Sequence, residues 1–207
     1  MEDFLSIADT IQVLFWSLTY VLIIVFSIKH WDELKKEKKI LIPITASMFN
    51  IAWEINAFVE SKGMWGHVLW LGLDIIIVLF NIYIYMRYSA KFCVIYSAAT
   101  IAVTIGLHFV FNIELGMLVS SFVVDIIMAV SFLISFKRLS VYGKPIIACT
   151  KLLGDLFAWL EYSNYHIIIK AIGIAVLALN IIYLVLSILE SIKFKKENKF
   201  KRKRIRF

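Results

Sequence analysis

The sequence predicts an all-α, polytopic membrane protein built from seven transmembrane helices. Hydrophobic residues make up 61% of the 207-residue chain, and the mean hydropathy is +0.85. Soluble domains contain roughly 45–50% apolar residues. A helix needs about 20 mostly apolar residues to cross a bilayer. The stretches that we predict to span are 10–28, 40–60, 66–86, 92–111, 116–136, 145–161 and 166–189.

Charges and prolines set the limits of these stretches. The first follows an acidic segment, Met1 to Asp9, which lacks the positive charge expected of a cleavable signal peptide. The second and the sixth begin next to Pro43 and Pro145, and proline is tolerated in the first turn of a helix. The sixth is the shortest and most polar. The seventh leads into a basic tail, 191–207, which we expect to lie outside the membrane.

The basic residues predict the orientation. Every lysine and arginine except Lys62, Lys151 and Lys170 follows an odd-numbered span. Because basic loops remain in the cytoplasm, we expect a multi-pass protein of the cell membrane with its N-terminus outside and its C-terminus inside. This orientation requires an odd number of spans. The tail could bind nucleic acid or anionic lipid, but we favour a topology anchor and expect no nucleic-acid partner.

Cysteine usage predicts neither a disulfide nor a metal centre. Cys93 and Cys149 are expected near cytoplasmic helix ends, where thiols stay reduced. The chain has no C-x-x-C motif and no clustered histidines, so we expect no metal and no cofactor. The sequence does not indicate an oligomeric state.

The two ends of the chain resemble each other. Pro43 precedes Glu54 much as Pro145 precedes Asp155. This pattern predicts two three-helix bundles of the same orientation joined by one helix, a parallel repeat of the kind found in transporters. Chance similarity between helices rich in Ile and Leu is the alternative. The predicted halves and the linker helix are 10–86, 116–189 and 92–111.

Carboxylates inside the predicted spans mark the candidate site, because an ionisable group in hydrocarbon is costly and normally faces a protein interior or cavity. At about 1.5 Å per residue, Glu54, Asp74, Asp125 and Asp155 lie roughly 9–14 Å below the outer helix ends. This shared depth predicts a pocket that opens toward the outer leaflet. If the repeat is real, Glu54 pairs with Asp155, and Asp74 with Asn180. The carboxylates are Glu54, Asp74, Asp125, Asp155 and, nearer an edge, Glu161.

Helical spacing places further polar and aromatic residues beside these acids, since residues three or four apart share a face. Polar residues also join membrane helices by hydrogen bonds across interfaces, so each has an ordinary structural explanation. Lys151 is four residues from Asp155 and could neutralise it, and Asp125 could equally pack against Lys151. The predicted pocket-lining residues are Asn50, Trp53, Trp70, Asp125, Lys151, Trp159, Asn180 and Tyr183.

Glu54 and Asp74 carry the chemical prediction. Each has a tryptophan adjacent or on the same face and no basic residue within one helical turn. In a dry site such an acid is expected to hold its proton, because desolvation disfavours the charged form. It could donate that proton to an epoxide or alkene, and tryptophan rings could stabilise the resulting cation.

The same motifs resemble a known family. Residues 50–54 resemble the N-x-x-W-E segment of the small integral-membrane terpene cyclases of fungal meroterpenoid and indole-diterpene (paxilline-type) pathways. Residues 70–74 resemble that family's W-x-x-L-D in the third span. Residues 131–154 resemble its span 5–6 segment, in which a basic loop leads into K-x-x-G, and 179–183 resemble its last span. The similarity covers about 40–190 of the chain.

The resemblance implies metal-independent cyclisation of a lipophilic prenyl or epoxyprenyl substrate, begun by a carboxylic acid. The family relies on a Glu in the second span, matched by Glu54, and on an Asp in the last span, where this chain has Asn180. Asp155 stands where the family tends to carry a hydroxyl residue. Either the second acid has moved to Asp155, or a related scaffold does different work. The predicted catalytic residues are Glu54, Asp74 and Asp155.

Two other functions remain open. A small-solute transporter or channel could use the same three-plus-one-plus-three plan, although its broken helices usually contain Gly or Pro near the midplane. Here both prolines lie at helix starts. A non-catalytic membrane sensor would use the carboxylates only to join helices. A photoreceptor is disfavoured, because Lys170 lies too near the outer edge for a buried Schiff base.

Overall fold

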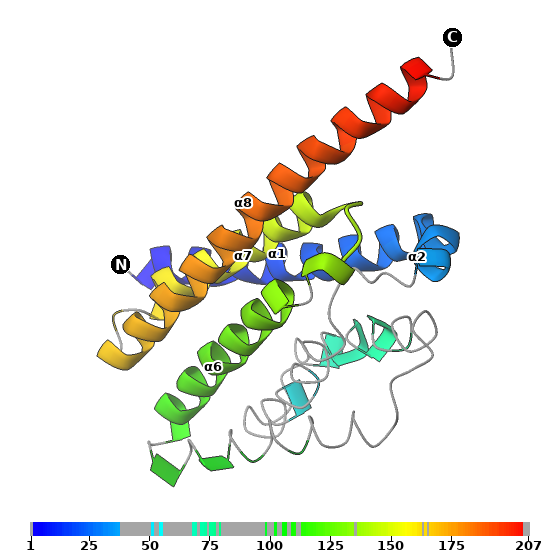
Figure 1. Ribbon diagram of the computed structural model, residues 1–207. Helices are drawn as coiled ribbons and strands as arrows, with labels where there is room; N and C mark the ends of the chain where they lie inside the picture. Colours follow the sequence, from blue (N-terminus) through cyan, green and yellow to red (C-terminus); the bar gives the residue numbers. More distant parts are fainter. Residues whose placement is uncertain are drawn as a thin grey trace.

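The structure is a computed structural model whose described part is helical. The described residues form helices, so the predicted all-α class is confirmed for this part of the chain. The description covers 2–37, 113–134, 136–162, 164 and 166–204, with scattered positions between 51 and 110. The elements are α1 (Glu2–Lys29), α2 (Trp31–Glu37), α6 (Ile113–Ile134), the 3-10 helix η1 (Phe136–Arg138), α7 (Lys144–Tyr162) and α8 (Ile167–Arg204) (Figure 1).

The described helices pack in the spatial order α1, α7, α8, α6, and each contacts the next (Figure 1). They bury two apolar clusters. One includes Phe132, Ile147 and Tyr183, and also Leu34 of α2. The other includes Phe122 and Val176 near the opposite ends of the helices, and Trp159 packs against it. Along α6, α7 and α8, the polar residues described below lie between these two clusters.

Two of the described helices are long and apolar enough to cross a membrane, Thr10–Lys29 within α1 and Ile167–Asn198 within α8. The apolar part of α6, Leu118–Ile134, is shorter. Lys151 and Asp155 lower the hydropathy of α7, the span predicted to be the most polar. The predicted count of seven spans is therefore not established. The predicted spans 40–60, 66–86 and 92–111 lie mostly outside the described residues.

Large apolar side chains cover much of the surface of the bundle, and several polar side chains are buried within it. Large apolar side chains face outward along α1 and α8, for example Leu14, Val25, Ile181 and Leu189. Soluble domains rarely expose large contiguous apolar patches. Beside the two apolar clusters, the bundle also buries polar and charged residues, among them Gln12, Thr19, Asp125, Lys144, Lys151, Asp155, Asn180 and Ser187.

Segments that follow three different predicted spans meet at one end of the bundle. The ring of Tyr142 stacks on His30 with centroids 4.1 Å apart and meets Phe194 edge-on at 5.6 Å. Gly143 precedes α7 with a φ of +77°, and a Cβ there would lie 2.6 Å from Phe26. Glycine is therefore required at this turn for both its backbone angle and its size. The segment after α1, the loop before α7 and the later part of α8 therefore lie together at this end.

Helix α8 continues without interruption through the segment predicted as a basic tail. It contains 38 residues and ends at Arg204, well beyond the predicted limit at 189. No glycine or proline follows Gly173, and Lys, Arg and Glu are good helix formers. At 1.5 Å per residue the helix is about 57 Å long, so it extends away from the other helices (Figure 1).

Gly154 sets the distance between α1 and α7. A Cβ at this position would lie 2.2 Å from Cδ1 of Trp16, so Gly154→Ala must displace the indole. We expect Gly154→Ala to lower the free energy of unfolding by about 1–3 kcal/mol, the usual cost of overpacking. Thermal unfolding in detergent measures this. Gly72→Ala is the matched control, because a Cβ at Gly72 meets nothing within 4 Å. Equal stability of the two variants would contradict this packing.

Candidate functional site: a buried cluster of carboxylates

Asp155 of α7 is the centre of the site. It is 1% exposed, and its two carboxylate oxygens accept hydrogen bonds from three other side chains. Trp16 Nε1 donates to Oδ1 over 3.0 Å, and Lys151 Nζ donates to Oδ2 over 2.7 Å. The Asn180 amide also donates to Oδ2. Donors on both oxygens stabilise the charged form of a carboxylate, so this arrangement suits an ionised group and not a proton donor.

The sequence around Asp155 explains how these partners reach it. Lys151 lies one helical turn earlier on the same helix, so the two side chains share a face. Trp16 of α1 can approach because position 154 has no side chain. Thr19, almost one turn beyond Trp16, donates to the Thr150 hydroxyl over 2.8 Å and holds α1 against α7.

Asp125 of α6 brings a second carboxylate to the same lysine. Its Oδ1 lies 3.9 Å from Lys151 Nζ, which is longer than a hydrogen bond and compatible with an ion pair. Asp125 is 7% exposed and Lys151 is 4% exposed. Lys151 therefore lies between two acids from neighbouring helices and is closer to Asp155.

Glu54 is the third acid of this group. It is 4% exposed, and its charge, like that of Asp155, acts on Asp125. We refer to Glu54, Asp125, Lys151 and Asp155 as the acid cluster. Among these four charged groups, three are acidic and one is basic. Unbalanced negative charge away from water is unfavourable, so the cluster favours states that retain a proton.

The structure brings together part of the predicted site. Asp125, Lys151, Asp155 and Asn180 meet, and Glu54 lies within electrostatic range. Asn180 bonds to Asp155, whereas its predicted partner Asp74 lies outside the described residues, as do Asn50, Trp53 and Trp70. The predicted pocket toward the outer leaflet would be bordered by that part of the chain.

Two predicted lining residues lie apart from Asp155. Trp159 donates to the backbone carbonyl of Lys170 over 3.3 Å and packs in the apolar cluster around Phe122. Tyr183 is almost a full turn beyond Asn180 and packs against Phe132, with ring centroids 4.9 Å apart. Neither residue contributes a described contact to Asp155.

Trp16 and Thr19 belong to the site although sequence reasoning did not select them. Tryptophan is enriched at the edges of membrane spans, whereas Trp16 lies inside the predicted span 10–28. A tryptophan in that position needs a partner for its N–H, and the nearest turn of the same helix adds a buried threonine. This combination is a signal that could have indicated a polar contact from α1.

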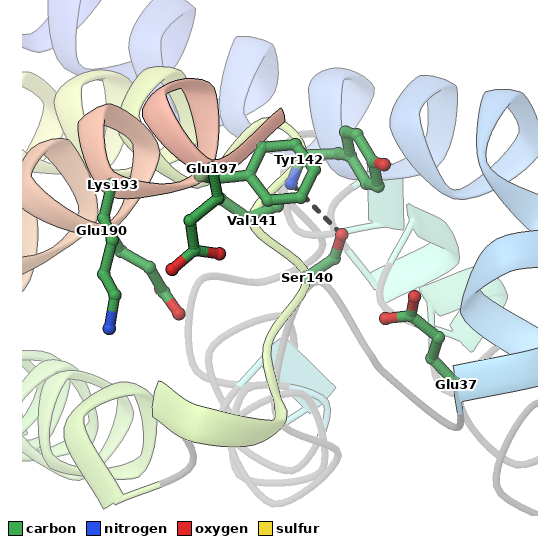
Figure 2. Close-up of a pocket in the computed structure, with 8 residues that line it drawn as sticks. Glu37, Ser140, Val141, Tyr142, Glu190, Lys193 and Glu197 are labelled. Atoms are coloured by element: carbon green, nitrogen blue, oxygen red, sulfur yellow. Dashed lines mark hydrogen bonds between the residues drawn. The ribbon is translucent and has the colours of Figure 1, made fainter. Parts of the chain in front are cut away.

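A pocket of about 230 Å³ lies at the end of the bundle where the loops meet. It is bordered by α2, the loop 139–143 and α8, and Figure 2 shows the carboxylates of Glu37, Glu190 and Glu197 around it. Burial, followed by the negative charges of Glu33 and Glu37, raises the pKa of the Tyr142 hydroxyl beside this pocket. Tyr142 therefore remains protonated at neutral pH.

Comparison with known proteins assigns no family to the chain. It matches no family model, and no curated protein or solved structure is significantly similar to it. The resemblance to integral-membrane terpene cyclases thus depends on the short motifs alone. Within the described ranges, no three His, Cys, Asp or Glu side chains are grouped to hold a metal ion.

Removing the lysine tests whether the acid cluster holds the bundle together. Lys151→Met leaves Asp155 buried without its cation, and breaking a buried ion pair from one side costs about 3–5 kcal/mol. We expect a corresponding loss in the free energy of unfolding, measured with denaturant in detergent. Lys151→Met combined with Asp155→Asn removes both charges and is expected to regain most of that loss.

Lys170→Met is the control for this experiment, because Lys170 is exposed at the start of α8. It is expected to leave the stability within the range of ordinary surface changes. An unchanged free energy of unfolding in Lys151→Met would show that the ion pair does not support the bundle.

Proposed function

We propose that this protein is a multi-pass membrane enzyme that cyclises a lipophilic prenyl or epoxyprenyl substrate by acid catalysis. The observation that carries the proposal is the burial of Asp125 and Asp155 on either side of Lys151, with a third buried acid, Glu54, close enough to act on Asp125. Buried acids whose environments differ are the usual means of supplying an acid and a base at neutral pH.

The outward apolar faces of α1 and α8 support a place in the bilayer. In water these faces would expose a large apolar surface, whereas in lipid they meet hydrocarbon. The common position of the loops after spans 1, 5 and 7 supports one cytoplasmic side. Positive charge in those loops favours the orientation with the C-terminus inside.

The contacts of each acid suggest different roles. Asp155 accepts hydrogen bonds on both oxygens and, with Lys151, forms a neutral pair. It would position its neighbours and not serve as the acid or the base of the reaction. Glu54 and Asp125 remain, and two like charges within electrostatic range disfavour ionising both. One shared proton would make one of them an acid and the other a base. The sequence suggested a catalytic role for Asp155 and a lining role for Asp125. The contacts suggest the reverse.

The reaction begins when the carboxylic acid of Glu54 protonates an epoxide oxygen or an alkene carbon. With an epoxide, the C–O bond breaks, and the electron pair of a neighbouring double bond forms the new C–C bond. The cation that results loses a proton to the Asp125 carboxylate, which leaves a double bond in the product. Protons balance over the cycle once Asp125 returns its proton to Glu54. Trp53, adjacent to Glu54 in sequence, could stabilise the cation.

The Asp155–Asn180 contact also bears on the resemblance. The cyclase family carries its second acid at the position of Asn180, and here that side chain bonds to Asp155. An acid at either position would therefore lie at the same point between α7 and α8. This supports the interpretation that the carboxylate of the last span has moved to span 6, where Asp155 positions its neighbours.

Replacing Glu54 tests the proposed acid. Glu54→Gln keeps the size of the side chain but cannot donate a carboxylic proton, so turnover is expected to fall by about 100-fold or more. The assay incubates purified protein in lipid nanodiscs with polyprenyl compounds, with and without a terminal epoxide, and follows cyclised products by mass spectrometry. Glu33→Gln, at an exposed position on α2, is the control and is expected to retain activity.

Other outcomes identify other functions. Full turnover in Glu54→Gln would exclude it as the acid. Lower thermal stability of Glu54→Gln, with no cyclised product from the wild-type protein or the variant, would indicate that Glu54 has a packing role. A change in the pH dependence of solute flux into vesicles, without product, would indicate a proton-coupled carrier.

Exchanging the side chains of positions 155 and 180 tests the moved acid. Asp155→Thr alone is expected to lose most activity, because Trp16, Lys151 and Asn180 then lack their common acceptor. Adding Asn180→Asp in the same protein returns a carboxylate to that point and is expected to restore activity at least partly. Product formation and melting temperature are measured together. A folded double variant no more active than Asp155→Thr would show that the two positions are not equivalent.

A further inference from the structure

Two hydroxyl groups in the bundle lie in an unusual position. Tyr183 is 1% exposed and Ser187 is 0% exposed. They lie one turn apart on α8, and the two side chains approach closely enough to interact. Within the described part of the chain, however, neither hydroxyl makes a hydrogen bond of normal geometry. Buried hydroxyl groups are almost always bonded to protein or to ordered water, so these two need a partner.

The two hydroxyls lie on one line between the acid cluster and the pocket. Asn180, Tyr183, Ser187 and Glu190 occupy one face of α8, within an arc of about 80° at 100° per residue. Asn180 bonds to Asp155 at one end of this face. Glu190 lines the pocket at the other end, about 15 Å away along the helix.

A second ion pair lies at the end of this row of residues that is nearest the pocket. Lys144 is 1% exposed, bonds to the Phe136 carbonyl over 3.2 Å and forms an ion pair with Glu190. Glu190 itself is partly exposed, with 38% of its side chain accessible. Its carboxylate therefore joins the buried interior to the pocket, where Figure 2 shows it beside Glu197.

We propose that Tyr183 and Ser187 hold ordered water molecules that conduct protons between the cytoplasmic pocket and the acid cluster. Each would bind water through a hydroxyl that can both donate and accept. In every transfer one O–H bond forms as another breaks, and no oxidation or reduction takes place. The route would let the shared proton of Glu54 and Asp125 exchange with the cytoplasm. The inference rests on the membrane-embedded acids of the proposed function and not on the substrate.

Proton exchange can be measured without any substrate. The full chain is placed in lipid nanodiscs, the buffer is changed from H₂O to D₂O, and infrared spectroscopy follows the C=O band of the protonated carboxyl group. Tyr183→Phe keeps the ring between Phe132 and Phe136 but removes the hydroxyl. We expect the exchange of that band to slow by about tenfold or more, since a positioned proton-transfer group contributes at least this much. Ser187→Ala is expected to act in the same direction.

Matched variants separate the route from general destabilisation. Ser120 is as buried as Ser187 but already bonds to the Gly116 carbonyl, so Ser120→Ala is expected to exchange at the wild-type rate. Tyr162 is the last residue of α7 and packs against the apolar cluster around Phe122. Tyr162→Phe is the control for Tyr183→Phe and is expected to exchange at the wild-type rate. A variant that lowers the melting temperature without slowing exchange points to packing and counts against the route.

Two results would overturn the inference, and they have different meanings. Wild-type exchange in folded Tyr183→Phe and Ser187→Ala would exclude this route and leave the acid catalysis of the proposed function untouched. Absence of a protonated carboxyl band in the wild-type protein would remove both the route and the shared proton on which the proposed chemistry depends.

Discussion

A buried carboxylate that accepts hydrogen bonds on both of its oxygens is the constraint on which the rest of the described structure depends. Taking Asp155 out of water is expensive unless donors occupy both of its oxygens. Those donors come from three helices: the indole of Trp16 from α1, the ammonium of Lys151 from α7 and the amide of Asn180 from α8. The helices must therefore converge at this one residue. The two apolar clusters on either side fill the space around it, but neither of them fixes which residues meet.

The same constraint explains how the other charged groups can serve chemistry. Because Lys151 lies closer to Asp155 than to Asp125, its positive charge only partly balances the carboxylate of Asp125 at 3.9 Å. In the proposed mechanism Asp125 and Glu54 share a proton inside the bundle. An acid and a base at one site would begin and end a cation cascade, and the apolar surroundings would protect the cation from water. The hydroxyls of Tyr183 and Ser187 add a way for this proton to equilibrate with one side of the membrane.

Contacts that depend on local spacing could be predicted from the sequence, whereas contacts between distant parts of the chain could not. The pairing of Lys151 with Asp155 follows from their spacing of four residues on one helix. The approach of Asp125 to Lys151 was one of the alternatives that the sequence allowed. Trp16 was missed because its partner is 139 residues away and no helical pattern relates the two. The helical course of the basic segment after 189 was missed because charge pattern indicated topology, whereas helix propensity decided local structure. Trp159 shares a face with Asp155 in sequence, yet it turns to the apolar cluster because its indole finds a carbonyl there.

Infrared spectroscopy of single variants tests most directly how charge is distributed in the acid cluster. Our account predicts a carboxylic C=O band in the wild-type protein that persists in Asp155→Asn, since Asp155 carries no proton. The band is expected to weaken or disappear in Glu54→Gln and in Asp125→Asn, the two acids that share one. If instead the band vanished only in Asp155→Asn, Asp155 would be the neutral acid, and the central interaction of this structure would be of the opposite kind.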